Sequence, residues 1–159
     1  MCGFAGYLDA DAKQMTAARV ESMARTLRHR GPDDADSWLD SRFGLALGHQ
    51  RLSIIDTSAA GRQPMVSANG RYVLALNGEI YNHRELRKGL AEYPFIGHSD
   101  SEVLLAQIER DGFLSALKLA AGMFALALWD RQDAVLHLAR DRLGEKPLYY
   151  GFLGSAFVF

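Results

Sequence analysis

Residues 72–82, Tyr72-Val73-Leu74-Ala75-Leu76-Asn77-Gly78-Glu79-Ile80-Tyr81-Asn82, decide the fold class. The first five of these residues are all apolar. Because side chains alternate between the two faces of a strand, they put hydrophobic groups on both faces. Residues 124–129, Phe-Ala-Leu-Ala-Leu-Trp, have the same property. Strands that are hydrophobic on both faces must be covered on both sides, which predicts stacked layers of sheet and helix.

The other strand candidates are apolar runs separated by short links. We expect them at residues 3–8, 43–48, 135–139, 148–152 and 156–159. The links at residues 131–133 and 153–155 have hairpin length, whereas parallel neighbours need a connection of roughly a dozen residues. The sheets are therefore expected to be antiparallel. Glycines at positions 3 and 6 indicate that another group packs against the backbone of the first strand.

Four helices are predicted from apolar residues at helical spacing and from terminal signals. Two of them begin with a capping pair, a polar side chain three residues before a glutamate: Asn82 with Glu85, and Ser99 with Glu102. The helices are expected near residues 20–27, from residue 82, from residue 99 to near residue 112, and at residues 114–119. They are expected to lie outside the sheets.

Length and composition indicate one globular domain without an extreme charge. The chain has 159 residues, of which 48% are hydrophobic and 23% charged, and this excludes disordered and fibrous classes. A net charge of -1 gives no field for phosphate backbones or anionic lipid, so nucleic acid and membranes are not expected partners. No apolar run approaches the ~18 residues of a membrane span, and a cytoplasmic location is expected. The single cysteine allows no internal disulfide.

Cys2 directly follows the initiator methionine, which makes it the first candidate for chemistry. A small residue at this position permits removal of Met1, and the new terminus then holds a thiol and an α-amine. The amine pKa is roughly 7.7–8.0 and the thiol pKa about 8.5, so the amine can accept the thiol proton near neutral pH. Two other interpretations remain open: a buried structural cysteine, and a cysteine paired with a histidine at position 29, 49, 83, 98 or 137.

The pair Asn77-Gly78 follows the apolar run directly and has two interpretations. Asn-Gly is a strong signal for a hairpin turn. Here, however, Ile80, Tyr81 and a capped helix come next, which places the pair where a strand end opens. At that position it can offer a side-chain amide and a backbone N–H to an oxyanion.

Arg51 and Asp100 carry charges that suit the two ends of an amino acid. Arg51 lies just beyond a predicted strand, and it is either a solvated surface charge or a fork for a substrate carboxylate. Asp100 lies in the first turn of a predicted helix, where it is either a favourable charge at the helix N-terminus or a partner for an ammonium group. The residues alone leave both alternatives open.

Six motifs in order resemble one known family over nearly the whole chain. They are MCGFAG at residues 1–6, RHRGPD at 28–33, GHQRLSIID at 48–56, NGEIYN at 77–82, SDSE at 99–102 and RDRLGEKPLY at 140–149. Together they resemble the N-terminal glutaminase domain of glutamine-hydrolysing asparagine synthetases, a class II glutamine amidotransferase. The resemblance implies the α+β fold of N-terminal-nucleophile hydrolases, a four-layer α/β/β/α sandwich of two antiparallel sheets between helix layers.

The resemblance also implies a role for each site residue in hydrolysing L-glutamine to L-glutamate and ammonia. Cys2 would be the nucleophile that forms a γ-glutamyl thioester, and Asn77 with Gly78 the oxyanion hole. Arg51 would bind the glutamine α-carboxylate and Asp100 its α-ammonium group. The remaining pocket residues would be Glu79 and the segment of Leu52, Ser53, Ile54 and Ile55. No metal and no organic cofactor is implied for this domain.

The family implies a partner domain as well. Asparagine synthetases use the ammonia in a second domain with a Ser-Gly-Gly-x-Asp type loop for ATP, and no such run occurs in this chain. We therefore expect residues 2–159 to be a glutaminase domain from a longer chain whose final strand candidate stops at Phe159. ATP and Mg²⁺ would be needed only by the missing synthetase domain, and a homodimer stays open.

Two alternatives follow from the same motifs. Amidotransferases of polysaccharide- or peptide-modifying clusters and β-lactam synthetases are built on the same plan. If Met1 is retained, the Cys2 nitrogen is an amide and cannot act as a base, and the chain would be a non-catalytic module that binds glutamine or a partner.

Overall fold

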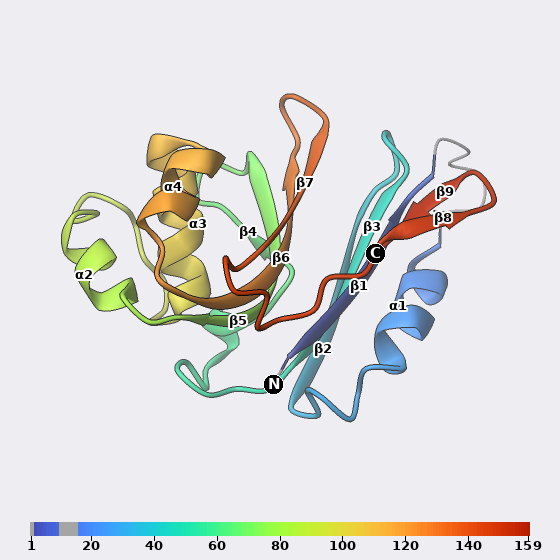
Figure 1. Ribbon diagram of the computed structural model, residues 1–159, viewed down its shortest axis with the longest axis horizontal. Coiled ribbons are helices and arrows are strands. Elements are labelled where there is room, and N and C mark those ends of the chain that lie inside the picture. Colours follow the sequence, from blue (N-terminus) through green and yellow to red (C-terminus); the bar gives the residue numbers. More distant parts are fainter. Residues whose placement is uncertain (1, 10–15) are drawn as a thin grey trace.

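Two antiparallel sheets, stacked face to face between helices, form the computed structural model, which describes residues 2–9 and 16–159 (Figure 1). The first sheet has the strand order β2-β3-β1-β9-β8 and the second the order β4-β5-β6-β7. The strands are β1 (Gly3–Leu8), β2 (Asp34–Asp40), β3 (Leu45–Arg51), β4 (Met65–Val66), β5 (Tyr72–Ile80), β6 (Gly122–Asp130), β7 (Val135–Arg140), β8 (Gly151–Leu153) and β9 (Ala156–Val158). The helices are α1 (Ala17–Arg25), α2 (His83–Lys88), α3 (Asp100–Asp111), α4 (Phe113–Leu119) and the 3-10 turn η2 (Ala59–Gly61).

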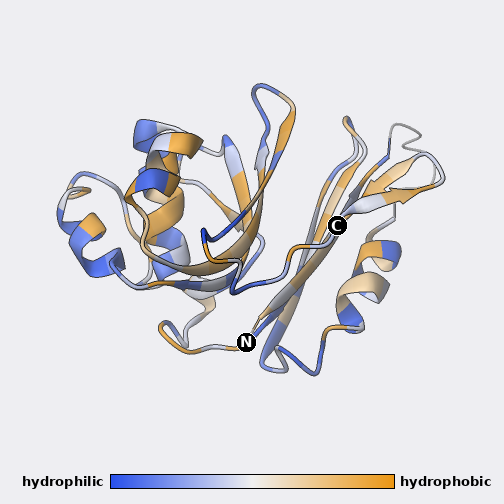
Figure 2. Ribbon diagram, in the orientation of Figure 1, coloured by the Kyte–Doolittle hydropathy of each residue, from blue (hydrophilic) through white to orange (hydrophobic). Residues whose placement is uncertain are grey.

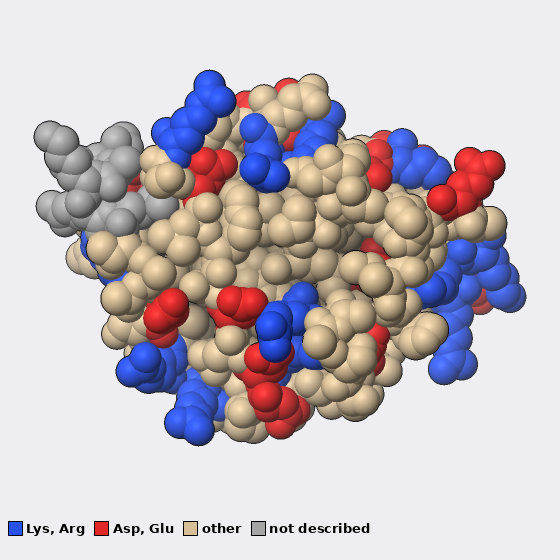
Figure 3. Space-filling model, turned by 180° about the vertical axis from the view of Figure 1, so that it is seen from behind, with Lys and Arg blue, Asp and Glu red and all other residues tan. Residues whose placement is uncertain are grey.

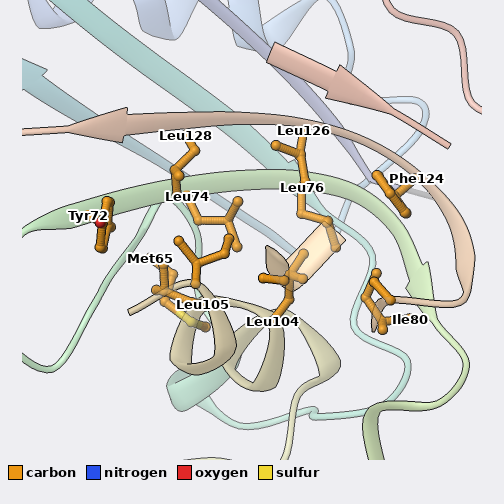
Figure 4. Close-up of a cluster of buried hydrophobic side chains, with 13 residues drawn as sticks. Met65, Tyr72, Leu74, Leu76, Ile80, Leu104, Leu105, Phe124, Leu126 and Leu128 are labelled. Atoms are coloured by element: carbon orange, nitrogen blue, oxygen red, sulfur yellow. The ribbon is translucent and has the colours of Figure 1, made fainter. Parts of the chain in front are cut away.

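Three hydrophobic clusters hold the four layers together. One lies between the second sheet and helices α3 and α4, where Leu74 and Leu76 of β5 pack with Leu104 and Leu105 of α3 (Figure 4). The second joins the two sheets, and Trp129 is its largest buried side chain. The third lies between α1 and the first sheet. Since each layer contacts the next through its own cluster, the predicted four-layer α+β sandwich is confirmed (Figure 2).

The predicted close approach to β1 is confirmed at Gly6. A Cβ built on Gly6 would lie 2.4 Å from the ring of Phe159, and this contact leaves no room for a side chain. The backbones of the two residues also exchange hydrogen bonds of 2.8 and 3.0 Å. A glycine is therefore required where Phe159 pairs with the backbone of β1.

The prediction that Asn77-Gly78 follows the end of a strand is wrong, and so is the hairpin interpretation. β5 continues to Ile80 and pairs with β6 along its whole length, from Tyr72 opposite Asp130 to Ile80 opposite Gly122. The polar pair stays in the strand because the ladder with β6 holds the backbone through Asn77 and Glu79, on either side of Gly78. Similarly, β3 ends at Arg51, so Arg51 lies in the strand and not beyond it.

Two strands were not predicted. β2 has the sequence Asp-Ala-Asp-Ser-Trp-Leu-Asp, which is too acidic for a strand signal, and it forms because seven of its residues pair with β3. β4 has only two residues. Of the predicted strand at residues 148–152, only the end belongs to β8, which begins at Gly151.

The capping prediction holds for one helix and is wrong for the other. Ser99 caps α3, because its Oγ accepts a hydrogen bond of 3.2 Å from the N–H of Glu102. Asn82 makes no side-chain cap for α2. Its amide instead bridges to the end of α4, donating to the carbonyl of Leu119 and accepting from the N–H of Ala121. A long-range contact thus replaces the local one.

The surface carries both signs of charge, as expected for a chain of this composition. On the face seen in Figure 3, basic and acidic side chains are interspersed, with uncharged residues between them. Within residues 2–9 and 16–159, no helix has the length and hydropathy of a membrane span.

Candidate active site

A cavity brings together nine of the ten predicted site residues. It lies near the start of β1, at the end of β3 and along β5, which Figure 1 shows converging beside the N-terminus. The predicted residues that line it are Cys2, Arg51, Leu52, Ile54, Ile55, Asn77, Gly78, Glu79 and Asp100. Ser53 does not line the cavity, and its N–H instead donates to Asp33 Oδ2 at 2.8 Å. The role of Ser53 as a pocket residue stays a prediction.

The thiol of Cys2 is fixed against the backbone of Leu52. Leu52 N–H approaches Cys2 Sγ at 3.4 Å, and the thiol approaches the Leu52 carbonyl at 3.6 Å. The Cys2 carbonyl accepts a hydrogen bond of 3.1 Å from Arg30 Nε. Burial raises the pKa of the Cys2 thiol, although the N–H of Leu52 lowers it. A thiol in this setting needs a base before it can attack. Met1, whose removal is predicted, lies outside the described residues.

One edge of β5 is open beside the cavity. β4 pairs with only two residues of β5, so the second half of β5 has no neighbouring strand on that side. Because N–H groups alternate between the two edges, those of Leu76, Gly78 and Ile80 face this edge. Ile80 N–H donates to Asp100 Oδ2 at 2.7 Å, and Leu76 is also bonded there by side chains. Gly78 lies between these two bonded positions and lines the cavity.

Only glycine fits at position 78. A Cβ there would lie 2.1 Å from the carbonyl oxygen of Met123 on β6. The preceding residue, Asn77, is 5% exposed. Its Oδ1 is one of two buried side-chain polar atoms in the described part of the chain that have no hydrogen-bond partner. Asn77 and Gly78 both line the cavity, where a side-chain amide and a backbone N–H can act as donors to an oxyanion.

The guanidinium of Arg51 is buried and braced by the loop that follows β3. Its Nη1 donates to the carbonyl of Ser58 at 2.9 Å, and its Nη2 donates to the carbonyl of Asp56. The residue is 7% exposed and lines the cavity. The interpretation as a solvated surface charge is therefore wrong. None of the ion pairs of the described residues involves Arg51, although its charge contributes to lowering the pKa of the nearby Asp56 carboxyl. A guanidinium in this setting can bind a further carboxylate.

Asp100 provides a negative charge in the same cavity. It is 6% exposed, and burial raises the pKa of its carboxyl, while the N–H groups of Ile80 and Ser101 lower it. Its Oδ1 accepts from Ser101 N–H at 3.0 Å. The helix-terminal role is thus observed, and the same carboxylate also lines the cavity, where a cation would relieve its desolvation.

Sequence reasoning missed several lining residues. Gln63, Asp56 and Ser101 line the cavity without having been predicted. Asp56 holds two segments together, since it accepts hydrogen bonds from His98 N–H at 2.7 Å and from Ser58 Oγ at 2.6 Å. These bonds lower the pKa of the Asp56 carboxyl to about 2. Its place at the end of the motif at residues 48–56 was the available signal, whereas Gln63 carried none.

No group of three His, Cys, Asp or Glu side chains within residues 2–9 and 16–159 is arranged to hold a metal ion. The chemistry that this cavity can perform with its own groups is attack by the thiol, stabilisation of an oxyanion, and capture of an amino acid between a cation and an anion.

Comparison with known proteins identifies the family. The family described as "Glutamine amidotransferase domain" matches residues 1–159. The chain therefore belongs to the glutamine amidotransferase domain family.

Individual relatives agree with this assignment. The chain is 38% identical to asparagine synthetase [glutamine-hydrolyzing] 2 of Bacillus subtilis, over all of this chain and 21% of that protein. It is 41% identical to asparagine synthetase B [glutamine-hydrolyzing] of Escherichia coli, over 96% of this chain and 27% of that protein. It is 38% identical to amidase chry2 of Gibberella zeae, over 94% of this chain and 24% of that protein. The chain thus spans about a quarter of the length of these relatives.

Proposed function

We propose that this domain hydrolyses the side-chain amide of L-glutamine, with Cys2 as the nucleophile. The observation that supports this most is that one cavity is lined by Cys2, by the proposed oxyanion donors Asn77 and Gly78, and by the buried charges of Arg51 and Asp100. Arg51 would bind the α-carboxylate and Asp100 the α-ammonium group of the substrate. Glutamine would then be held by both ends of its zwitterion, with its side chain directed at Cys2.

The reaction proceeds in two balanced steps. In the first, Cys2 Sγ attacks the amide carbon, and the negative charge on the carbonyl oxygen is received by Asn77 and Gly78. The carbon–nitrogen bond then breaks, the nitrogen takes the proton that came from the thiol, and ammonia leaves a γ-glutamyl thioester. In the second step water attacks the thioester, which releases glutamate and restores the thiol.

The proton of the thiol goes to the α-amine of Cys2. Burial raises the pKa of the thiol, so little thiolate exists at neutral pH without a base. We propose that Met1 is removed, which frees the amine for this role. The thiol, the amine and the two oxyanion donors meet every need of the hydrolysis, so no metal or organic cofactor takes part. The cytoplasm, which keeps thiols reduced, suits this nucleophile.

The ammonia is proposed to pass to a synthetase domain of a longer protein, which would use it with ATP, Mg²⁺ and aspartate to form asparagine. Two of the three relatives described above are named glutamine-hydrolysing asparagine synthetases, and the matched region makes up 21% and 27% of their lengths. The likeness to amidase chry2 supports a second candidate, an amidotransferase with another ammonia acceptor.

The test is hydrolysis by a sample that begins at Cys2, as verified by intact mass. Glutamate and ammonia should form in equal amounts, and Cys2→Ala should abolish both while the circular dichroism spectrum is unchanged. A sample that retains Met1 serves as the matched control and should be inactive. Full activity with Met1 attached would contradict the proposed base. If the correctly processed, folded domain released no ammonia, the non-catalytic alternative would hold.

A further inference from the structure

Two side chains occupy the place of a missing strand at Leu76, one residue before Asn77. The N–H of Leu76 donates to Gln63 Oε1 at 2.7 Å, and its carbonyl oxygen lies 3.0 Å from His49 Nε2. Both bonds lie on the open edge of β5, beyond the short β4. His49 comes from β3 in the other sheet, and Gln63 from the segment before β4. Both backbone polar groups of Leu76 are therefore hydrogen-bonded by side chains, in place of a neighbouring strand.

The protonation of His49 follows from its surroundings. The side chain of His49 is 0% exposed. Burial lowers the pKa of its ring to about 4, although the hydrogen bond to Leu76 acts in the opposite direction. The ring is therefore neutral at neutral pH, with one N–H. Since the Leu76 carbonyl can only accept, the proton is on Nε2. Nδ1 is buried and has no hydrogen-bond partner in the described part of the chain, so the Leu76 bond is the one polar contact that orients the ring.

The orientation of Gln63 is determined in a similar way. Its Nε2 donates to Ser101 Oγ at 3.2 Å, which leaves Oε1 to accept from Leu76. Ser101 belongs to α3, next to Asp100. Gln63 thus connects the backbone of Leu76 to the first turn of α3, the helix that carries Asp100.

We propose that His49 is a positioning residue for the oxyanion hole, acting through the peptide that joins Leu76 to Asn77. The carbonyl of Leu76 and the nitrogen of Asn77 belong to one planar peptide group, so a bond that fixes the carbonyl fixes the start of Asn77. From there the side-chain amide of Asn77 and the N–H of Gly78 project to the cavity. This inference rests on the proposed glutaminase function and assigns to that reaction a residue outside the cavity lining.

Variants of His49 can be chosen by whether they keep the donor to the Leu76 carbonyl. Glutamine at position 49 carries its amide nitrogen as many bonds from Cβ as Nε2 of histidine, so His49→Gln can restore the bond. His49→Asn has its nitrogen at the level of Nδ1 and cannot reach Leu76. His49→Leu removes the donor altogether. The matched control is Trp129→Phe, which deletes another hydrogen bond between the sheets, the one of 3.0 Å from Trp129 Nε1 to Asp40 Oδ2, away from the cavity.

Steady-state hydrolysis of glutamine separates positioning from general stability. His49→Leu and His49→Asn should lower kcat on the order of 10- to 10²-fold, as expected for slightly misplaced catalytic donors, with KM unchanged. His49→Gln should recover most of kcat. Trp129→Phe should lower the unfolding temperature and leave kcat unchanged. If His49→Leu does not fold, the comparison of His49→Gln with His49→Asn carries the same test. Unchanged kcat in His49→Asn, failure of His49→Gln to recover it, or an equal loss in Trp129→Phe would overturn the inference.

A second readout does not depend on turnover. The amide ¹⁵N resonance of Asn77 reports the hydrogen bond to the Leu76 carbonyl, because the two atoms share one peptide group. The Asn77 and Gly78 amide resonances should move in His49→Asn, return in His49→Gln and stay in place in Trp129→Phe. If the wild-type domain proved inactive, the proposed function would fail, and these resonances would still decide whether His49 positions the segment. Unmoved resonances in His49→Asn would overturn the inference.

Discussion

At the residue scale, the side chain of Asn77 is buried, and its Oδ1 has no hydrogen-bond partner among residues 2–9 and 16–159. Because Oδ1 can only accept, an oxyanion would use the Nδ2 donors of the same amide. We expect Asn77→Ala to lower kcat for glutamine hydrolysis on the order of 10²- to 10³-fold, the usual effect of deleting one oxyanion donor. Steady-state kinetics of ammonia release would measure it.

The control for this variant is another asparagine of the same segment. Asn82→Ala removes an amide that bonds Leu119 and Ala121 and does not line the cavity. It should lower the unfolding temperature and spare kcat. Equal kcat values for Asn77→Ala and the wild type would mean that the oxyanion is stabilised elsewhere.

Arg51 and Arg62 offer a matched pair of cations for testing substrate capture. Arg51 is buried in the cavity wall, whereas the Arg62 side chain is 53% exposed and bonds Asp34 at 3.0 Å. We expect Arg51→Ala to reduce kcat/KM for glutamine on the order of 10²-fold, because the substrate carboxylate would lose its charged partner. Arg62→Ala should leave kcat/KM unchanged. An equal effect of the two variants would argue against a carboxylate site at Arg51.

At the scale of elements, the segment after β7 is organised by one carboxylate. Asp141 accepts hydrogen bonds from the N–H groups of Glu145, Lys146 and Phe124, at 2.9, 3.1 and 3.2 Å. Burial raises the pKa of Asp141, but these donors outweigh it and lower the pKa to about 2, below the ordinary value of 3.8. The ionised form is thus the one that stabilises the fold.

The sign of this shift gives a pH-dependent prediction. The stability that Asp141 contributes is fully present above its unfolded-state pKa and is lost as the pH falls through its folded-state pKa of about 2. Asp141→Asn should therefore lower the free energy of unfolding at neutral pH, and its difference from the wild type should shrink at about pH 3. Urea unfolding at the two pH values measures this. A difference that grows in acid would show that the carboxylate does not stabilise the segment as an anion.

At the scale of the whole molecule, each sheet packs on the other sheet and on a helix layer through a buried hydrophobic cluster. We therefore expect the domain to release ammonia from glutamine without ATP or aspartate. An assay with glutamine, aspartate, ATP and Mg²⁺ should yield ammonia and glutamate at the rate seen with glutamine alone. Formation of asparagine or AMP by the pure domain would contradict its assignment as a glutaminase unit.

Much of this architecture could be predicted because its signals are local. Apolar runs predicted β5 and β6, and Ser99 predicted the start of α3. Gly6 predicted the close contact with β1. In each case the residue type itself indicates the structure. β2 and the second half of β5 could not be found in this way. They form strands because β3 and β6 pair with them. Pairing between segments that are distant in the sequence cannot be predicted from local composition.

The sequence by itself determined the family, the layered class and the identity of the charged and nucleophilic residues at the site, since each depends on residue type and order. Tertiary structure alone decided that Arg51 is buried, that the N–H of Ser53 donates to Asp33, and that Asn77-Gly78 lies inside a strand. It also brought His49 and Gln63 to Leu76 from segments 27 and 13 residues away. The physical reason is that an open strand edge must find hydrogen-bond partners, and which side chains reach it depends on how the two sheets stack.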